Sequence, residues 1–232
     1  MGRLLWYPLH AGFFFLVLLF VLHVHTGRVN AGGIGNPVAD LSPESHGRIA
    51  LDYERGEPDI ESDQSGFHGG SREERILLKY GLGLNSAIDL FIRLGLAAHE
   101  TPSRNFNGSF GPAYGAGLKW IVYKTEAVSA GMGIQILEFH TKDDRSAFPR
   151  LRWDEVDVFF GGVFEKVEWM RPYGGFLFSI GRGKFKQGPR IELESLGDLF
   201  IGAEFLYKRL HFVSELRLIH ENGLTFSVGY SL

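Results

Sequence analysis

The stretch that decides the fold is residues 75–97, RILLKYGLGLNSAIDLFIRLGLA, in which every second residue is apolar. The alternating apolar residues are Ile76, Leu78, Tyr80, Leu82 and Leu84, followed by Ile88, Leu90, Ile92, Leu94 and Leu96. A period of two belongs to a β-strand, because successive side chains of a strand point to opposite faces. A helix would hold Gly81, Gly83 and Gly95 in its interior, at a cost of about 1 kcal/mol each. The stretch therefore predicts a β-hairpin.

The length of the two predicted strands indicates a membrane. Each has about ten residues, which matches the ~9–11 that a tilted strand needs to cross a bilayer and exceeds the roughly five to six of an ordinary strand. We expect the turn to be the three-residue loop 85–87, since matching the apolar faces of the strands requires an odd loop. A half-buried sheet of a soluble protein shows the same alternation, so its recurrence along the chain decides between the two.

The alternation recurs in ten segments. We predict strands at 48–54, 75–84, 88–97, 113–123, 127–139, 153–165, 172–181, 198–207, 210–219 and 223–232. The links at 85–86, 124–126, 166–171 and 208–209 are short, whereas those at 55–74, 99–112, 140–152 and 182–197 are long and polar. Only 220–222 breaks this order. Short links at one end and long ones at the other are typical of an up-and-down barrel with periplasmic turns and external loops.

No segment after residue 31 has a helical period, so no helix is available to cover the apolar faces. A closed barrel with its apolar face toward lipid solves this, because closure satisfies every backbone group and leaves no edge. We predict an all-β fold, a closed antiparallel up-and-down transmembrane β-barrel of ten strands, with eight strands as the alternative. A soluble lipocalin-like barrel would need the reverse arrangement, with its charges outside.

The N-terminus has the pattern of a targeting segment. The apolar run 13–22 follows Arg3 and is shorter than the about 20 residues of a transmembrane helix. It suits a secretory signal, and Val29-Asn30-Ala31 offers a cleavage site. We expect a signal peptide at 1–31, a periplasmic N-terminal segment at 32–46 and an outer-membrane barrel domain at 47–232. An uncleaved anchor is the alternative.

Composition excludes several functions. The chain has no cysteine, which rules out disulfides and thiol chemistry, and its net charge of −3 does not favour nucleic acid as a partner. The Gly-X-Gly units lack the third glycine of a dinucleotide site. We expect no cofactor, and no metal, because the histidines show no ligand spacing.

The alternating strands from residue 47 onward, and the last strand GLTFSVGYSL, resemble those of small bacterial outer-membrane β-barrel proteins of the OmpA-like or opacity type. The chain ends in Leu232 where that family usually has Phe. The resemblance implies a place in the outer membrane of a Gram-negative-type envelope, contact with its lipid, and recognition by the barrel-assembly machinery. We expect a monomer, with an unidentified surface ligand.

Charges of both signs fall on the inward parity of the strands. They include Glu54 and Glu155, and the charge network is predicted to comprise Arg48, Asp52, Arg75, Lys79, Asp89, Arg93, Lys119, Asp157, Glu204, Glu215 and Arg217. Because an unpaired buried charge is costly and a ten-strand barrel is narrow, these side chains should meet and plug the lumen. A small selective pore is the alternative.

Aromatic residues are expected at the two membrane interfaces. Those near the predicted external ends are Tyr53, Tyr114 and Trp153, and those near the periplasmic ends are Tyr123, Trp169, Tyr173, Tyr207 and Tyr230. Strict alternation also turns Glu138 toward lipid at the external rim, unless a bulge near Leu137 corrects its face.

These features favour a structural or surface-interaction protein of the outer membrane without enzymatic activity. A small porin is the alternative. A third possibility is a rim protease of the omptin type, since His99, His140 and His220 fall at external strand ends near Asp143 and Asp144. No motif of that family is present, so we expect no catalytic residues.

Overall fold

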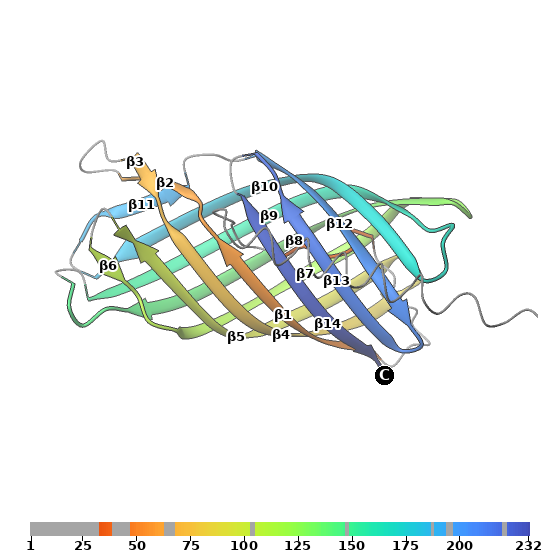
Figure 1. Ribbon diagram of the computed structural model, residues 1–232, viewed down its shortest axis with the longest axis horizontal. Coiled ribbons are helices and arrows are strands. Elements are labelled where there is room, and N and C mark those ends of the chain that lie inside the picture. The colour runs from red at the N-terminus through yellow and green to blue at the C-terminus, as the bar shows by residue number, and fades with distance from the viewer. Residues whose placement is uncertain are drawn as a thin grey trace, which may run out of the picture.

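The computed structural model describes residues 33–38, 47–62, 68–102, 105–146, 149–186, 188–193, 197–219 and 222–232. Its wall consists of β1 (Arg48–Gly56), β4 (Arg72–Asn85), β5 (Ile88–Thr101), β7 (Gly111–Lys124), β8 (Val128–Lys142), β9 (Arg150–Phe164), β10 (Met170–Phe185), β12 (Gly197–Tyr207), β13 (Leu210–Arg217) and β14 (Gly223–Ser231). Each of these ten strands pairs antiparallel with the next one in the list, so that β10 pairs with β12, and β14 pairs with β1 to close the ring (Figure 1). The predicted closed barrel of ten strands is confirmed, and the count of eight was wrong.

The first hairpin keeps the apolar faces of its two strands matched, but not through the predicted three-residue loop 85–87. Residues 86–87 form a two-residue turn between β4 and β5, and Asn85 pairs with Ile88. The register shifts between Gly83 and Asn85, so a β-bulge at Leu84 supplies the odd residue. The Asn85 Oδ1 atom accepts the Ala87 amide at 2.8 Å and stabilises the turn.

The segments predicted to be external loops contain four further strands. They are β2 (Asp59–Ser62), β3 (His68–Gly70), β6 (Phe106–Asn107) and β11 (Arg190–Leu193). The outer part of β10 pairs with β11, β11 pairs with β2, and β2 pairs with β3. Figure 1 places these strands together at the end of the barrel opposite the C-terminus. The wall therefore continues into an ordered external extension.

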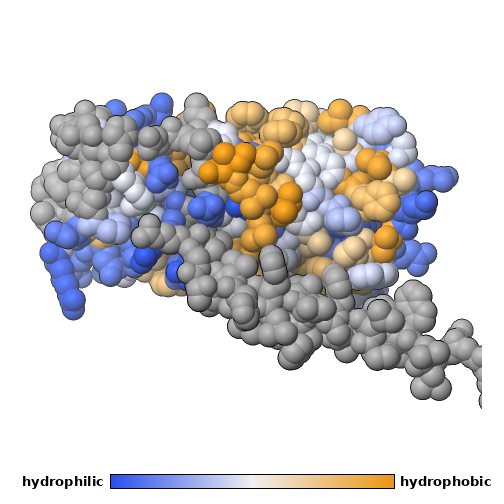
Figure 2. Space-filling model, turned by 45° about the horizontal axis from the view of Figure 1, so that its top comes forward, coloured by the Kyte–Doolittle hydropathy of each residue, from blue (hydrophilic) through white to orange (hydrophobic). Residues whose placement is uncertain are grey.

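The outward face is apolar around the ring. Leu51 of β1 is 55% exposed, Leu94 of β5 56% and Val228 of β14 50%. Figure 2 shows hydrophobic atoms over the middle of the molecule and hydrophilic ones toward both ends. Apolar area of this extent is stable only when another apolar phase covers it, and a bilayer supplies one. The strands therefore span a membrane with the apolar parity toward lipid.

No helix among the described residues is long and apolar enough to cross a membrane.

Two clusters of buried apolar side chains occupy the interior. The outer cluster includes Ile60 of β2, Phe106 of β6, Phe139 of β8, Trp153 of β9, Phe185 of β10 and Ile191 of β11. The inner cluster, nearer the periplasmic turns, includes Ile34, Val38, Phe159, Val163, Tyr173, Leu177 and Phe200. The short external strands thus contribute side chains that fill the outer end of the barrel.

Candidate functional site in the barrel lumen

A two-pronged contact of the charge network joins Arg75 of β4 to Glu155 of β9. The Arg75 Nη1 and Nη2 atoms lie 3.1 and 2.5 Å from the two Glu155 carboxylate oxygens, and both side chains are buried. Arg75 Nη2 also lies 2.5 Å from Glu73, and the Trp153 indole donates to Glu155 at 3.1 Å. A two-pronged pair of this kind is among the stronger interactions in proteins and ties β4 to β9 across the lumen.

A second group of charges links β1, β4 and β5. Arg93 contacts Glu54 and lies 3.4 Å from Asp52, and Lys79 lies 3.2 Å from the same Asp52 oxygen. Farther round the wall, the Gln135 amide donates to Asp157 at 2.7 Å. Because Asp52, Glu54, Arg93 and Asp157 are buried, removing the partner of one of them would leave a buried charge uncompensated.

Residues 33–38 lie inside the barrel. Ile34 and Val38 are buried in the inner apolar cluster, against side chains such as Phe159 and Tyr173. The sequence placed these residues in a periplasmic segment, and the pattern offered no reason to place them in the lumen. The remaining residues of that segment, apart from 33–38, and the predicted signal peptide lie outside the described residues.

Two buried carboxylates hold this lumen segment, which we define as residues 33–38. Glu215 of β13 accepts the backbone amides of Ile34 and Gly35 at 3.0 and 2.9 Å, and the Tyr173 hydroxyl at 3.0 Å. Glu204 of β12 accepts the Asn36 side-chain amide at 3.2 Å. The segment is therefore bound by specific polar contacts as well as by apolar packing.

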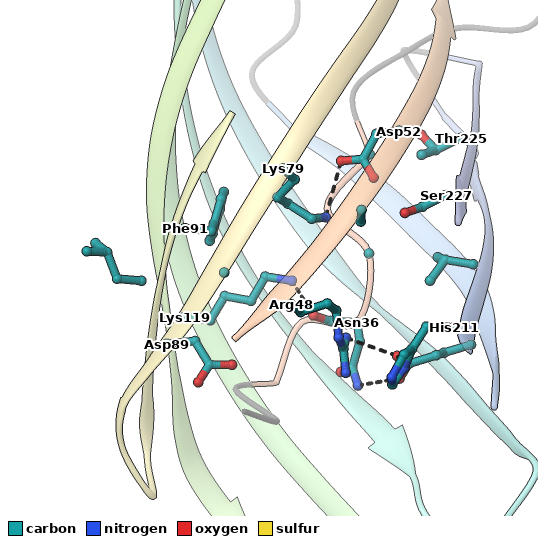
Figure 3. A pocket seen from close by; sticks show the side chains of 17 residues that line it. Asn36, Arg48, Asp52, Lys79, Asp89, Phe91, Lys119, His211, Thr225 and Ser227 are labelled. Atoms are coloured by element: carbon teal, nitrogen blue, oxygen red, sulfur yellow. Dashed lines mark hydrogen bonds and ion pairs between the residues drawn. The ribbon is translucent and has the colours of Figure 1, made fainter. Parts of the chain in front are cut away.

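Cations from the wall complete the binding of the segment. The Lys119 ammonium donates to the carbonyls of Ile34 and Asn36 at 2.9 and 2.5 Å. Arg48 and His211 approach the Glu204 carboxylate, at 3.2 and 2.9 Å. Figure 3 shows Lys119, Asn36, Arg48 and His211 converging in this region, with the Lys79–Asp52 pair nearby.

Little space remains beside the lumen segment. The cavity there measures about 60 Å³ and is lined by Gly35, Asp52, Lys79, Phe91 and Lys119 among others. Sites for small-molecule ligands usually measure about 300–1,000 Å³. The cavity has room for a few water molecules, and its size argues against a ligand site in the lumen.

The structure places every predicted charge of the network in the interior. The side chains concerned are Arg48, Asp52, Arg75, Lys79, Asp89, Arg93, Lys119, Asp157, Glu204, Glu215 and Arg217. Arg217 acts electrostatically on Glu155, Asp157 and Glu215. The network is thus distributed over strands on all sides of the lumen.

Two of the predicted interface aromatics lie inside the barrel instead. Trp153 is 0% and Tyr173 6% exposed, because both fall on the inward parity of β9 and β10. Their assignment to the membrane interface rested on their position along the strand and did not consider which face of the strand they occupy. The other predicted aromatics lie on the outer surface; they are Tyr53, Tyr114, Tyr123, Trp169, Tyr207 and Tyr230.

Sequence reasoning missed Asn36, His211 and the inward role of Tyr173. The lumen segment lies within GGIGNPV, where single apolar residues stand among small ones. Gly35 has a φ of +65°, a conformation that glycine adopts without strain. A side chain at Gly33 would collide with Thr225 of β14. Small residues therefore let this backbone pass close to the wall.

The rim histidines do not form a common site. His99 is buried and hydrogen-bonded to Glu73 at 3.0 Å and to Thr101 at 3.1 Å. His140 lies on the outer face, 3.0 Å from Glu138. His220 falls outside the described residues. In the part of the chain that the structure describes, no three histidine, aspartate or glutamate side chains cluster as a metal site would require.

The similarities of this chain to known proteins are distant. No family model matches the chain, and no curated protein matches its sequence. Similar solved structures include the outer-membrane protease OmpT of Escherichia coli (10% identity, 83% of this chain and 99% of that one, TM-score 0.45). An outer-membrane channel of Pseudomonas putida F1 matches at 9% identity over 87% of this chain and 100% of that one, with a TM-score of 0.47. The attachment invasion locus protein Ail of Yersinia pestis matches at 10% identity over 80% and 97%, with a TM-score of 0.30. At these values no argument about function rests on them.

Three features of the structure agree with one another. The antiparallel strands form a closed ring, the outward-facing side chains are apolar, and the interior is charged and filled. The chain is a small β-barrel of the outer-membrane type.

Proposed function

We propose that the protein is a sealed barrel of the bacterial outer membrane, with a structural or surface-interaction role and no enzymatic activity. Its partners on this account are the surrounding lipid and, during biogenesis, the barrel-assembly machinery, and it acts as a monomer. The observation that carries the proposal is the lumen segment, which Glu215 and Lys119 hold inside the barrel.

Three successive obstacles support a closed lumen. The lumen segment and the inner apolar cluster occupy the periplasmic half. The Arg75–Glu155 pair crosses the interior. At the external end, side chains such as Phe106, Phe185 and Ile191 form an apolar core. A hydrated ion would have to pass an apolar core that offers it no ligands, which is costly.

The ordered external extension supports a role at the cell surface. The strands β2, β3 and β11 pair with one another and with β10, so they present a fixed surface beyond the membrane. Rigid surfaces suit recognition because little ordering entropy is lost on binding. In the part of the chain that the structure describes, His99 is bonded to Glu73 and Thr101, and His140 to Glu138, which argues against a His–Asp catalytic pair at these two histidines.

Planar-bilayer recording tests the proposal against the porin alternative. Mature protein, refolded and inserted into the bilayer, should show no stable openings over a wide voltage range. Insertion is verified separately by the heat-dependent gel mobility of a folded barrel. Steady openings of porin size from inserted protein would overturn the sealed lumen and favour a channel for small solutes.

A further inference from the structure

A second site lies on the outside of the barrel, at the external ends of β7 to β10. It is an open groove with a volume of about 700 Å³. We call it the basic groove and define it by its outward side chains: Phe110, Pro112, His140, Lys142, Arg150, Arg152, Lys184 and Lys186. The groove holds five cationic side chains and one histidine, from β8, β9, β10 and the residue that follows β10, and it belongs to no site considered above.

Strand register places these side chains directly beside one another. His140 of β8 pairs with Arg152 of β9, and Arg152 pairs with Lys184 of β10, which forms one row. Lys142 pairs with Arg150, and the Lys186 amide donates to the Arg150 carbonyl at 2.8 Å, which forms the next row outward. Like charges directly opposite each other on neighbouring strands are destabilising. The two rows therefore concentrate positive charge at a cost to the fold.

The carboxylates nearby offset only part of this charge. Glu138 and Asp154 lie on the inner side of the groove, and both pair with Arg152 at 3.1 Å. Among the described residues, the side chains of the four other cations form no ion pair; they are Lys142, Arg150, Lys184 and Lys186. An anion bound between the rows would relieve the repulsion.

The height of the groove places it above the hydrocarbon layer. The next row inward pairs Glu138, Asp154 and Arg182, and the row below that is apolar, with Ile136, Val156 and Ile180. Each row is two residues along a tilted strand, or about 5 Å in height. The cations thus lie roughly 10 and 15 Å above the last apolar row, whereas the polar layer of a bilayer is about 5–7 Å deep on each side.

We propose that the basic groove binds the phosphorylated sugar headgroup of a glycolipid in the outer leaflet. A headgroup of linked sugars reaches the height of both rows, which the phosphate of a simple phospholipid does not. Arginine and lysine hold phosphate oxygens by charge-assisted hydrogen bonds, and their flexible stems can reach down toward the membrane. Phe110 and Pro112 form an apolar wall against which sugar rings pack. The inference rests on the proposed outer-membrane location.

The test compares two variants of the full mature protein, refolded in detergent, with equal changes of charge. The groove variant is Lys142→Gln/Arg150→Gln/Lys184→Gln/Lys186→Gln. The control variant is Lys124→Gln/Lys166→Gln/Lys208→Gln/Arg209→Gln, whose exposed side chains lie at the periplasmic turns. Native mass spectrometry measures binding of three probes: the bis-phosphorylated disaccharide lipid known as lipid A, its dephosphorylated form, and inorganic pyrophosphate.

We expect the wild type and the control variant to retain lipid A, and the groove variant to bind it about tenfold or more weakly. The dephosphorylated lipid and pyrophosphate should bind weakly to all three proteins. Equal retention of lipid A by the groove variant would overturn the proposal. Tight binding of pyrophosphate that depends on the groove would identify a site for free anions and overturn the lipid assignment. Channel recordings on the same proteins report separately on the sealed lumen, so either proposal can fail alone.

Discussion

The carboxylate of Glu215, on β13, accepts the backbone amide of Ile34 at 3.0 Å inside the barrel. Its second oxygen accepts the amide of Gly35 at 2.9 Å. One buried side chain of the wall thus binds two successive amides of a segment that precedes the first strand. Buried amides that lose their acceptor become costly, so the position of the lumen segment depends on this carboxylate.

Glu215→Gln should therefore loosen the lumen segment. Glutamine keeps the shape of the side chain but offers one oxygen in place of two and carries no charge. Amide hydrogen exchange at Ile34 and Gly35, followed by NMR in micelles, should become faster than in the wild type. Glu192→Gln, an exposed carboxylate of β11, is the matched control and should leave the exchange unchanged. Equal protection in Glu215→Gln and wild type would show that apolar packing alone holds the segment.

Arg75→Met should be strongly destabilising, because it leaves the Glu155 and Glu73 carboxylates in the interior without their cationic partner. The expected cost is about 3–5 kcal/mol, and Arg75→Met/Glu155→Met should cost less than the single change. Arg72→Met is the control, since Arg72 is exposed and pairs with Glu57 at 3.2 Å; it should cost under about 1 kcal/mol. Urea unfolding from lipid vesicles measures all of these. A cost at Arg75 no larger than that at Arg72 would mean that the charge network is hydrated.

Ile92→Arg should distinguish a membrane barrel from a soluble one. Ile92 lies in the middle of the outward apolar run of β5, where arginine costs about 2–4 kcal/mol at the bilayer midplane. Leu84→Arg, next to the periplasmic turn, should cost about 0–1 kcal/mol. Unfolding in vesicles gives both values. Near-zero costs at both positions would contradict a lipid-facing apolar parity.

The hydrogen bonds of Asp143 lead to a prediction of how acid changes the stability of the external loops. It follows β8 and connects its own loop to β6, since its carboxylate accepts the amides of Asn107 at 2.8 Å and Arg145 at 2.9 Å. These backbone hydrogen bonds lower the pKa of Asp143 below its ordinary value of 3.8. A carboxyl whose folded-state pKa is depressed contributes stability that is present above its unfolded pKa and is lost as the pH falls through the folded value.

Asp143→Asn should accordingly be less stable than wild type at neutral pH, and the difference should vanish in acid below the depressed pKa. Hydrogen exchange of the Asn107 and Arg145 amides is the local readout. Asp144→Asn, the exposed neighbour, is the control and should behave as wild type at every pH. A difference between Asp143→Asn and wild type that persists unchanged in strong acid would refute the electrostatic explanation.

The strands were predictable because their evidence is local. Alternation along 75–97 identifies both strands and their outward face, and the same parity assigns Arg75 and Glu215 to the lumen. The paired partners were not predictable, since parity says nothing about which side chains meet across a barrel. Trp153 shows a different kind of error, because its parity was present in the sequence and its height was given more weight.

The lumen segment could not be predicted from any local pattern. Residues 33–38 have no strand or helix period, and their contacts reach Lys119 and Glu215, which are 85 and 181 residues away from Ile34. The pairing of β11 with β2 has the same origin. Each depends on closure of the barrel, which brings distant parts of the chain together.

The most direct test of the account measures access to the lumen beside residues 33–38. The chain has no cysteine, so a single introduced thiol is unique. Ser227 is buried and lines the cavity beside the lumen segment, and Ser227→Cys changes its volume little. Thr125→Cys, at an exposed periplasmic turn, gives the labelling rate of a free position.

A membrane-impermeant maleimide should label Ser227→Cys far more slowly than Thr125→Cys in otherwise unchanged protein. Removal of residues 33–38 should raise the rate at Ser227→Cys toward that of Thr125→Cys and leave the latter rate unchanged. Rapid labelling of Ser227→Cys with residues 33–38 in place would contradict a lumen sealed by this segment.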